Sequence, residues 1–184
     1  MAKKFAAIII LCEDLMHGNF VRHYLLQKGV PPNKIIRINN CPAGKQSGAQ
    51  YVLQNYPKEV SALRSTHYIS QGLIAVIDAD TFTGEERMAN CRKALLDAGL
   101  ENKTDAESIS VIVPRRNVET WIYHLLGNVV NETDKYDNRV EHANVKPVAQ
   151  EFASRCPGSL KADCPPSMNT GCAELTKFIA KIAG

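Results

Sequence analysis

The sequence predicts an α/β protein in which a parallel sheet of about four strands is flanked by helices and followed by a C-terminal helical tail. Two observations support this fold class. Apolar runs of six to eight residues recur along the chain, and each is followed by a segment whose apolar residues have helical spacing. Strands buried on both faces appear as continuous apolar runs, and their alternation with helices favours a parallel sheet.

Four strands and four helices are expected in alternating order. The strands are predicted at 5–12, 34–39, 73–78 and 108–113. The helices are predicted at about 18–28, 49–64 and 83–98, and from 117 to 127. Glycine and proline end several of these elements, among them Gly29 with Pro31 and Pro32, Gly99 and Gly127. The segment CPAGKQSG at 41–48 is expected to be a loop.

The character of the chain changes after Gly127. Residues 128–144 are polar and predict a surface insert. A short helix is expected from Pro147 to Arg155, and a last amphipathic helix over about 170–183. We therefore expect an α/β domain at 1–127, with the insert and C-terminal helices of 128–184 packed on the same domain.

The charge of the chain is uneven. Residues 1–77 hold nine Lys and Arg against three Asp and Glu, a local excess of +6, whereas the whole chain carries +3. A basic half attracts polyanions such as nucleic acid, but it can equally be a solvated face.

No membrane span or export signal is expected. The longest apolar run, at 5–12, is far shorter than the roughly 20 residues needed to cross a bilayer, and no cleavage site follows it. These features predict a cytoplasmic protein. The six cysteines form no CxxC pair, so reduced thiols are expected rather than disulfides or a zinc site.

Acidic residues follow two of the predicted strands. Glu13 follows the first strand, and Asp78 and Asp80 stand at the end of the third. Ligands of parallel sheets bind at the carboxyl ends of the strands, and alternate residues leaving a strand point the same way. Oxygen ligands of this kind suit Mg²⁺ or Mn²⁺. The alternative is that these acids cap the following helices.

Basic residues are expected on the same edge. Lys45 lies in the glycine-containing loop, which does not match the P-loop pattern, and Arg115 and Arg116 follow the fourth strand. All three are candidates for binding a substrate phosphate, although a plain turn and a surface pair are the simpler interpretations. Glu119 could hold a second cation or bond to Arg115.

For Trp121 and His17, a structural role is the simpler expectation. Trp121 lies on a predicted helix near Ile122 and Leu125 and is expected in the core. His17 is close enough to Glu13 to act as an acid or base, but a loop histidine is the simpler expectation.

Two segments resemble the acidic motifs of Toprim domains, which place a glutamate after the first strand and D-x-D after a later one. These segments are IIILCEDLMHGNFVRHYL and LIAVIDADTFTGEERM. Two later segments, VIVPRRNVETWIYHLLG and PPSMNTGCAELTKFI, resemble the tail of small stand-alone Toprim-like proteins. The chain as a whole is similar to the Toprim domain of the overcoming-lysogenization-defect nucleases. Toprim glutamates are often followed by glycine, whereas Glu13 is followed by Asp14. The chain has no ATPase motif, zinc ribbon or topoisomerase tyrosine domain, which argues against primase and topoisomerase roles.

The resemblance implies a Mg²⁺- or Mn²⁺-dependent phosphoryl-transfer enzyme acting on nucleic acid, in particular a nuclease of the kind found in phage defence. Glu13, Asp78 and Asp80 would then be catalytic and metal-binding residues, with Glu119 as a further metal ligand. The alternative is a non-catalytic Toprim module that binds nucleic acid or works with a nuclease or ATPase encoded nearby.

Overall fold

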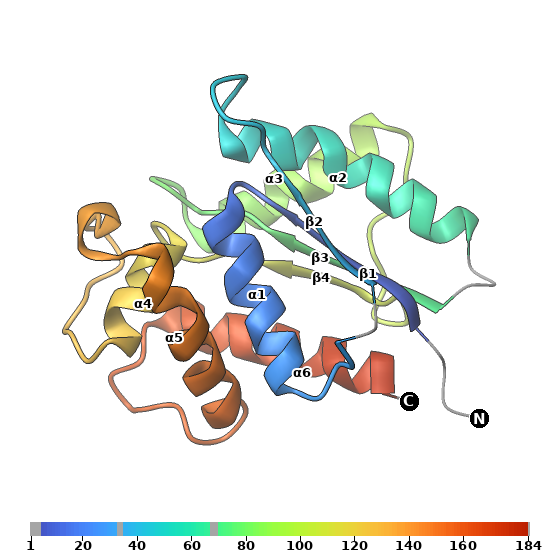
Figure 1. Ribbon diagram of the computed structural model, residues 1–184. Helices are drawn as coiled ribbons and strands as arrows, with labels where there is room; N and C mark the ends of the chain where they lie inside the picture. Colours follow the sequence, from blue (N-terminus) through green and yellow to red (C-terminus); the bar gives the residue numbers. More distant parts are fainter. Residues whose placement is uncertain (1–4, 33–34, 67–69, 184) are drawn as a thin grey trace.

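A computed structural model of the protein describes residues 5–32, 35–66 and 70–183. Its sheet contains β1 (Phe5–Cys12), β2 (Ile35–Asn40), β3 (Ser70–Val76) and β4 (Ile109–Ile112). All neighbouring strands are parallel, in the order β2-β1-β3-β4 (Figure 1). The predicted α/β fold is therefore confirmed. Lys34, the predicted first residue of the second strand, lies outside the described residues.

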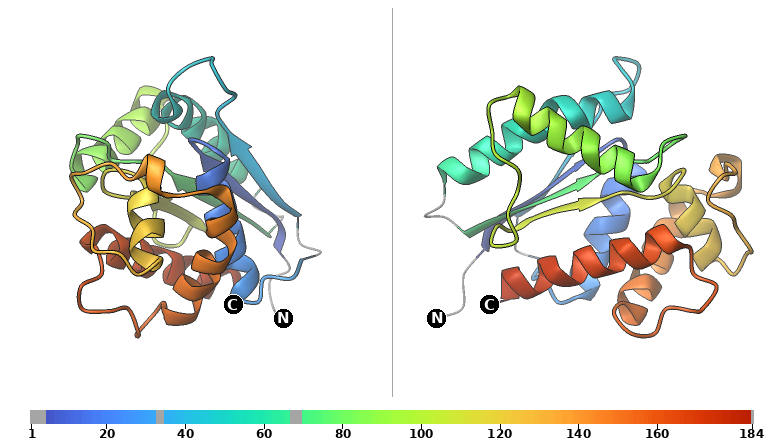
Figure 2. Two further views of the ribbon diagram at one scale, coloured as in Figure 1. Left: turned by 60° about the vertical axis from the view of Figure 1, so that its left-hand side comes forward. Right: turned by 180° about the vertical axis from the view of Figure 1, so that it is seen from behind.

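Helices cover both faces of the sheet. The helices are α1 (Leu15–Gln27), α2 (Gly48–Ser65), α3 (Gly84–Asp97), α4 (Val118–Leu125), α5 (His142–Arg155) and α6 (Pro166–Ala183), with a 3₁₀ turn η1 (Asp137–Arg139) in the predicted insert. One layer contains α2 and α3, and the other contains α1, α4, α5 and α6 (Figures 1 and 2). The sheet is thus a middle layer between two layers of helices.

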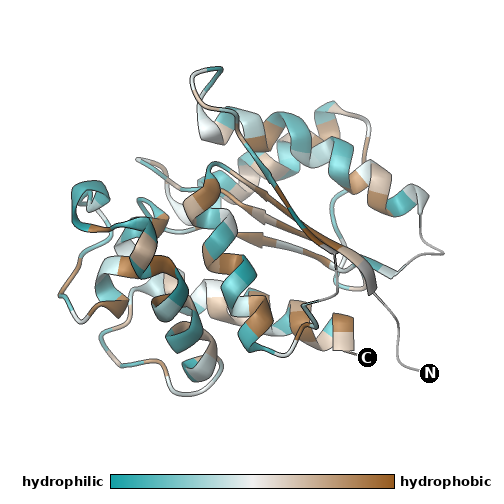
Figure 3. Ribbon diagram, viewed as in Figure 1, coloured by the Kyte–Doolittle hydropathy of each residue, from teal (hydrophilic) through white to brown (hydrophobic). Residues whose placement is uncertain are grey.

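The central strands are buried on both faces because their apolar side chains alternate between two cores. Ile8, Ile10 and Cys12 of β1 pack in the core under α1, whereas Leu11 packs in the core under α2 and α3. The central strands β1 and β3 are accordingly largely hydrophobic (Figure 3). This double burial explains the continuous apolar runs in the sequence.

The core under α1 is rich in aromatic rings. The Phe152 ring of α5 lies 5.5 Å from the ring of Phe20 and 6.1 Å from that of Trp121, measured between centroids. Trp121 is 1% exposed, which confirms its predicted place in the core. A Cβ on Gly171 of α6 would lie 2.3 Å from the Trp121 ring, so α6 needs a glycine there to pack this closely.

Three helices begin earlier than the sequence predicts. The first begins at Leu15 rather than about 18, because the Asp14 carboxylate caps it by accepting the N–H groups of Met16 and His17. The helix expected to open at Pro147 begins at His142 and contains this proline in its interior. The last helix begins at Pro166 rather than about 170. Proline suits a first helical position because its missing N–H would have no helical partner there.

A disulfide joins Cys156 and Cys172, so the expectation of reduced thiols is wrong for this pair. The end of α5 and the middle of α6 bring their Cα atoms to 5.7 Å, a proximity that their separation of 16 residues does not reveal. Across the described ranges, none of the helices is long and apolar enough to cross a membrane.

Candidate functional site

Two of the predicted acidic residues meet where the central strands β1 and β3 end. Cys12 is the last residue of β1 and pairs with Val76. One step further, the Glu13 Oε1 atom accepts the backbone N–H of Asp78 at 2.7 Å. The Glu13 side chain therefore takes the place of the next backbone acceptor of β1, and it brings its carboxylate to the edge of the sheet next to Asp78.

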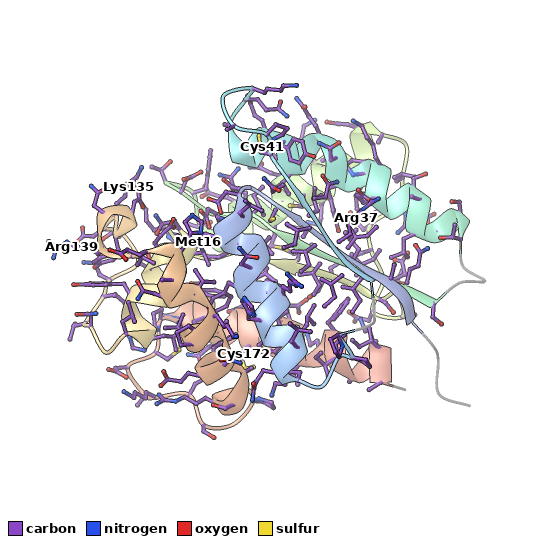
Figure 4. All side chains as sticks on the ribbon, viewed as in Figure 1. Met16, Arg37, Cys41, Lys135, Arg139 and Cys172 are labelled. Carbon is purple, nitrogen blue, oxygen red and sulfur yellow. A yellow bond between two sulfur atoms is a disulfide. The ribbon has the colours of Figure 1, made fainter. Side chains whose placement is uncertain are left out.

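The predicted loop at 41–48 reaches this site through its last residue. A Cβ on Gly48 would lie 2.7 Å from Glu13 Oε2 and 2.5 Å from Glu13 Cβ. Gly48 is the first residue of α2, whose N-terminal N–H groups favour a nearby negative charge. Lys45 itself is exposed on the loop. Figure 4 labels Cys41 at the start of this loop and Met16 at the start of α1.

His17 lies between two carboxylates. Its Nδ1 atom lies 2.8 Å from Asp14 Oδ1 and its Nε2 atom lies 2.9 Å from Asp78 Oδ1. The imidazole is 2% exposed. Burial alone would lower the pKa of His17, but the attraction of Asp78 and its hydrogen bond to Asp14 outweigh it and raise this pKa well above its usual value. An imidazolium donates from both nitrogens, which suits two carboxylate acceptors.

The expectation of a loop position for His17 is therefore wrong. His17 is the third residue of α1 and points into the interior. The sequence prediction missed this because it began the helix three residues too late. The signal was Asp14, a good N-cap residue two positions before Met16, which places His17 in the first helical turn.

Negative charge is crowded around Asp78. Burial, followed by the charge of Asp78, raises the pKa of Glu13 to about 7. The same two causes raise the pKa of Glu119, on the first turn of α4, to about 7. Burial opposes the charge of Asp14, but the hydrogen bond from His17 outweighs it and lowers the pKa of Asp14 to about 2. His17 thus neutralises only part of the charge that these carboxylates bring together.

Asp80 adds negative charge near Glu13 and Asp78, but it has a counter-ion of its own. It adopts a left-handed conformation with φ of 54°, and its Oδ2 atom lies 3.3 Å from Nη2 of Arg87 on α3. The expectation that Asp78 and Asp80 point the same way assumed an extended backbone, and the left-handed conformation of Asp80 does not meet that condition. Asp80 does not cap α3 either, since Thr83 does so.

Of the two arginines after β4, Arg116 bonds to Asp80 through its backbone. The backbone N–H of Asp80 donates to the Arg116 carbonyl at 3.0 Å, and Arg116 also has a positive φ, of 68°. The Nε atom of Arg116 is buried and has no hydrogen-bond partner within the described residues. Arg115 lines a neighbouring cavity. Among these described residues, no hydrogen bond joins Glu119 to Arg115.

Within the described ranges, no three His, Cys, Asp or Glu side chains are arranged to hold a metal ion together. The Glu13 carboxylate contacts the Asp78 amide, and the charge of Asp78 contributes to the raised pKa of Glu119, whereas Asp80 is paired with Arg87. Comparison with known proteins adds no family: no family model, curated protein or solved structure matches this chain.

Proposed function

We propose that the protein is a Mg²⁺- or Mn²⁺-dependent phosphodiesterase that acts on nucleic acid, in particular a nuclease. The observation that carries this proposal is the meeting of Glu13 and Asp78 at the carboxyl edge of the sheet. The Glu13 Oε1 atom lies 2.7 Å from the backbone N of Asp78, and His17 neutralises only part of the negative charge there. The resemblance of both acidic segments to Toprim motifs supports the same chemistry.

The donor set fits a hard divalent cation. Glu13, Asp78 and Glu119 offer only carboxylate oxygens, and the raised pKa of Glu13 and of Glu119 indicates charge that a cation would stabilise. As described, these three side chains are not arranged around a common ion, so they would hold it only after moving together, and Asp80 would join them only by leaving Arg87. A bound divalent ion supplies Lewis-acid stabilisation of a phosphoryl group and activation of water.

Other side chains position the site and bind the substrate. His17 holds Asp78 in place through Nε2 and is itself held by Asp14. The Nε donor of Arg116 is buried without a partner among the described residues, so it would reach a phosphate oxygen only after the side chain moves. Arg115 and Lys45 add positive charge on either side of the acidic residues. Acids at the centre and bases around them suit a substrate with a negatively charged backbone.

A second candidate function is a non-catalytic module that binds nucleic acid or a partner nuclease or ATPase. The specific observation in its favour is that both aspartates already have protein counter-ions, since His17 binds Asp78 and Arg87 binds Asp80. In such a module the acidic edge would be satisfied without a metal ion.

Cleavage assays distinguish the two functions. The purified protein is incubated with single- and double-stranded DNA and RNA in Mg²⁺, in Mn²⁺ or in EDTA. A nuclease gives cleavage that requires the metal and is lost in Asp78→Asn, whereas the control Asp97→Asn, on the exposed side of α3, cleaves like the original protein. Cleavage that persists in EDTA, or in Asp78→Asn, would contradict the proposal. Binding without cleavage in all conditions would favour the non-catalytic module.

A further inference from the structure

A cavity of about 460 Å³ lies beside the acidic edge, between α3, α6 and the outer side of β4. In the sheet order β2-β1-β3-β4, β4 is an edge strand of the described sheet. The right-hand view of Figure 2 shows β4 with α3 on one side and α6 on the other. The volume falls in the range of about 300–1,000 Å³ that is usual for small-molecule sites.

The cavity and the acidic edge share one backbone segment. Arg115 lines the cavity, and the residues on either side of it bond to the segment that carries the acids. The carbonyl of Pro114 accepts the N–H of Ala79 at 2.9 Å, and the carbonyl of Arg116 accepts the N–H of Asp80 at 3.0 Å. A phosphate near Asp78 and Asp80 would therefore have this cavity next to it, with Arg115 between the two.

The lining combines apolar walls with a few polar groups. Apolar surface comes from Val111, Val113 and Met88. The charged lining residues are the acids Glu85, Glu132 and Glu174 and the bases Lys103 and Arg115. This composition suits a flat, largely apolar group that also carries hydrogen-bonding atoms.

Ser167 is the polar group whose bonding is most informative. Its Oγ atom accepts the backbone N–H of Arg115 at 3.0 Å and the indole N–H of Trp121 at 2.8 Å. Both lone pairs are therefore used, and within the described residues the hydroxyl proton has no acceptor. Because Ser167 lines the cavity, this proton is available to an acceptor inside it.

We propose that this cavity binds the nucleoside next to the phosphate at the acidic edge, and hence that the substrate presents an unpaired nucleotide. This inference rests on the proposed action on nucleic acid. The base would lie against Val111, Val113 and Met88, with Ser167 donating to one of its acceptors. Glu174 is suited to a sugar hydroxyl or an exocyclic amine, and Arg115 is suited to the phosphate. A paired base cannot enter such a cavity without leaving its stack, so single strands and frayed ends are preferred over intact duplex.

A large side chain placed at the exposed side of the cavity should fill it and so test the proposal. Thr170 lines the cavity on α6, is exposed, and its hydroxyl bonds only within its own helix, to the Pro166 carbonyl. Thr170→Trp should occupy the cavity, and Thr170→Phe should do so in part. Asn169→Trp is the matched control, because Asn169 is the preceding exposed residue of the same helix and does not line the cavity. Melting temperatures verify that each variant is folded.

Binding is measured in EDTA, so that the result does not depend on cleavage. The probes are nucleoside monophosphates, by calorimetry, and a short DNA oligonucleotide as a single strand and as a duplex, by fluorescence anisotropy. We expect the single strand to bind more tightly than the duplex, and Thr170→Trp to weaken binding by about tenfold or more, the size of one lost base contact. Thr170→Phe should have a smaller effect and Asn169→Trp should have none.

The outcomes separate this inference from the proposed nuclease activity. Binding that is sensitive to Thr170→Trp, in a protein that never cleaves, would support the cavity and overturn the nuclease. Metal-dependent cleavage with unchanged binding and unchanged cleavage in Thr170→Trp would overturn the cavity and leave the nuclease standing. Equal binding of single strand and duplex would also overturn it, as would occupation of the cavity by an extended peptide in place of nucleotides.

Discussion

Asp78 and Asp80 stand two residues apart at the end of one strand, yet their surroundings differ in almost every respect. The Asp78 side chain is 9% exposed and is held by the buried imidazole of His17. The Asp80 side chain is 49% exposed, extends from a left-handed backbone and faces Arg87. Asp78 therefore depends on a protein counter-ion, whereas water solvates much of Asp80.

The difference shows that one short acidic motif can serve two purposes. A buried carboxylate is stable only with a partner, so the fold supplies His17 from α1 across the sheet edge. A half-exposed carboxylate is solvated without its ion pair, so Asp80 itself loses little by changing partner, whereas the Arg87 side chain, which is 5% exposed, would lose its counter-ion. Asp78 is thus suited to a fixed role in the site, and Asp80 to one that changes when a cation or substrate arrives.

The largest effect is expected from removing the counter-ions. His17→Leu should lower the free energy of unfolding by about 3–5 kcal/mol, because it leaves Asp78 buried without a partner. Arg87→Met should cost far less, about 1 kcal/mol, because Asp80 is open to water and Met keeps much of the buried volume. Urea unfolding at pH 7 measures both. Equal losses in the two variants would show that the two aspartates do not differ as described.

A second effect is a loss of stability as the pH rises. The pKa of Glu13 is raised from 4.5 to about 7, so between these values the folded protein keeps a proton that the unfolded chain has lost. The free energy of unfolding should therefore fall from pH 4.5 to pH 7, by about 1.4 kcal/mol for each unit by which the pKa is raised. Unfolding in EDTA measures the slope.

Glu13→Gln should flatten that slope, because its amide does not titrate, and Glu119→Gln should flatten it by a similar amount. The control is Glu85→Gln, which removes an exposed carboxylate from α3. If Glu13→Gln kept the full slope, the crowding of charge around Asp78 would not be its cause.

A third, smaller effect is the response to a divalent cation. Mg²⁺ should raise the melting temperature by mass action, and a concentration of ten times Kd stabilises by about 1.4 kcal/mol. Asp78→Asn should abolish the shift, whereas Asp80→Asn should keep most of it because Asp80 is bound to Arg87. Differential scanning fluorimetry with Mg²⁺ and EDTA measures the shift. If both variants lost it equally, Asp80 would be a full ligand that leaves Arg87 when the ion binds.

The smallest effect is expected at the cap of α1. Asp14→Asn keeps a good N-cap residue and should lower the free energy of unfolding by less than about 1 kcal/mol, whereas Asp14→Ala should cost more. The Asp14 side chain is 53% exposed, so solvent weakens its ion pair, and the buried His17 keeps Asp78 as a charged acceptor in the Asn variant. Thermal unfolding of both variants measures the difference, and an Asn variant as unstable as the Ala variant would show that the ion pair outweighs the cap.

The sequence was sufficient to predict the sheet and the meeting of Glu13 with Asp78. Continuous apolar runs identified the strands, and the rule that parallel strands end at one edge placed both acids there. Conformation after the strand could not be predicted in the same way. Asp80 and Arg116 have positive φ values, and no glycine marks either position.

The sequence pattern also could not predict the counter-ions of the two aspartates or the disulfide. His17 became part of the site only because the start of α1 turns it toward Asp78, and the chain separation of 61 residues gives no sign of that contact. Cys156 and Cys172 meet only because the end of α5 comes next to α6 at that point. Such contacts depend on how the helices pack, which short-range patterns do not encode.

The hydrogen bond from the Asp78 amide to Glu13 makes that amide a spectroscopic reporter of the site. A cation that draws the Glu13 carboxylate away would leave the amide proton without its acceptor. In nuclear magnetic resonance spectra the proton resonance of Asp78 would then shift strongly, and its exchange with deuterated solvent would become faster. A single backbone signal would thus report the occupancy of the acidic edge in solution, without a substrate and without an activity assay.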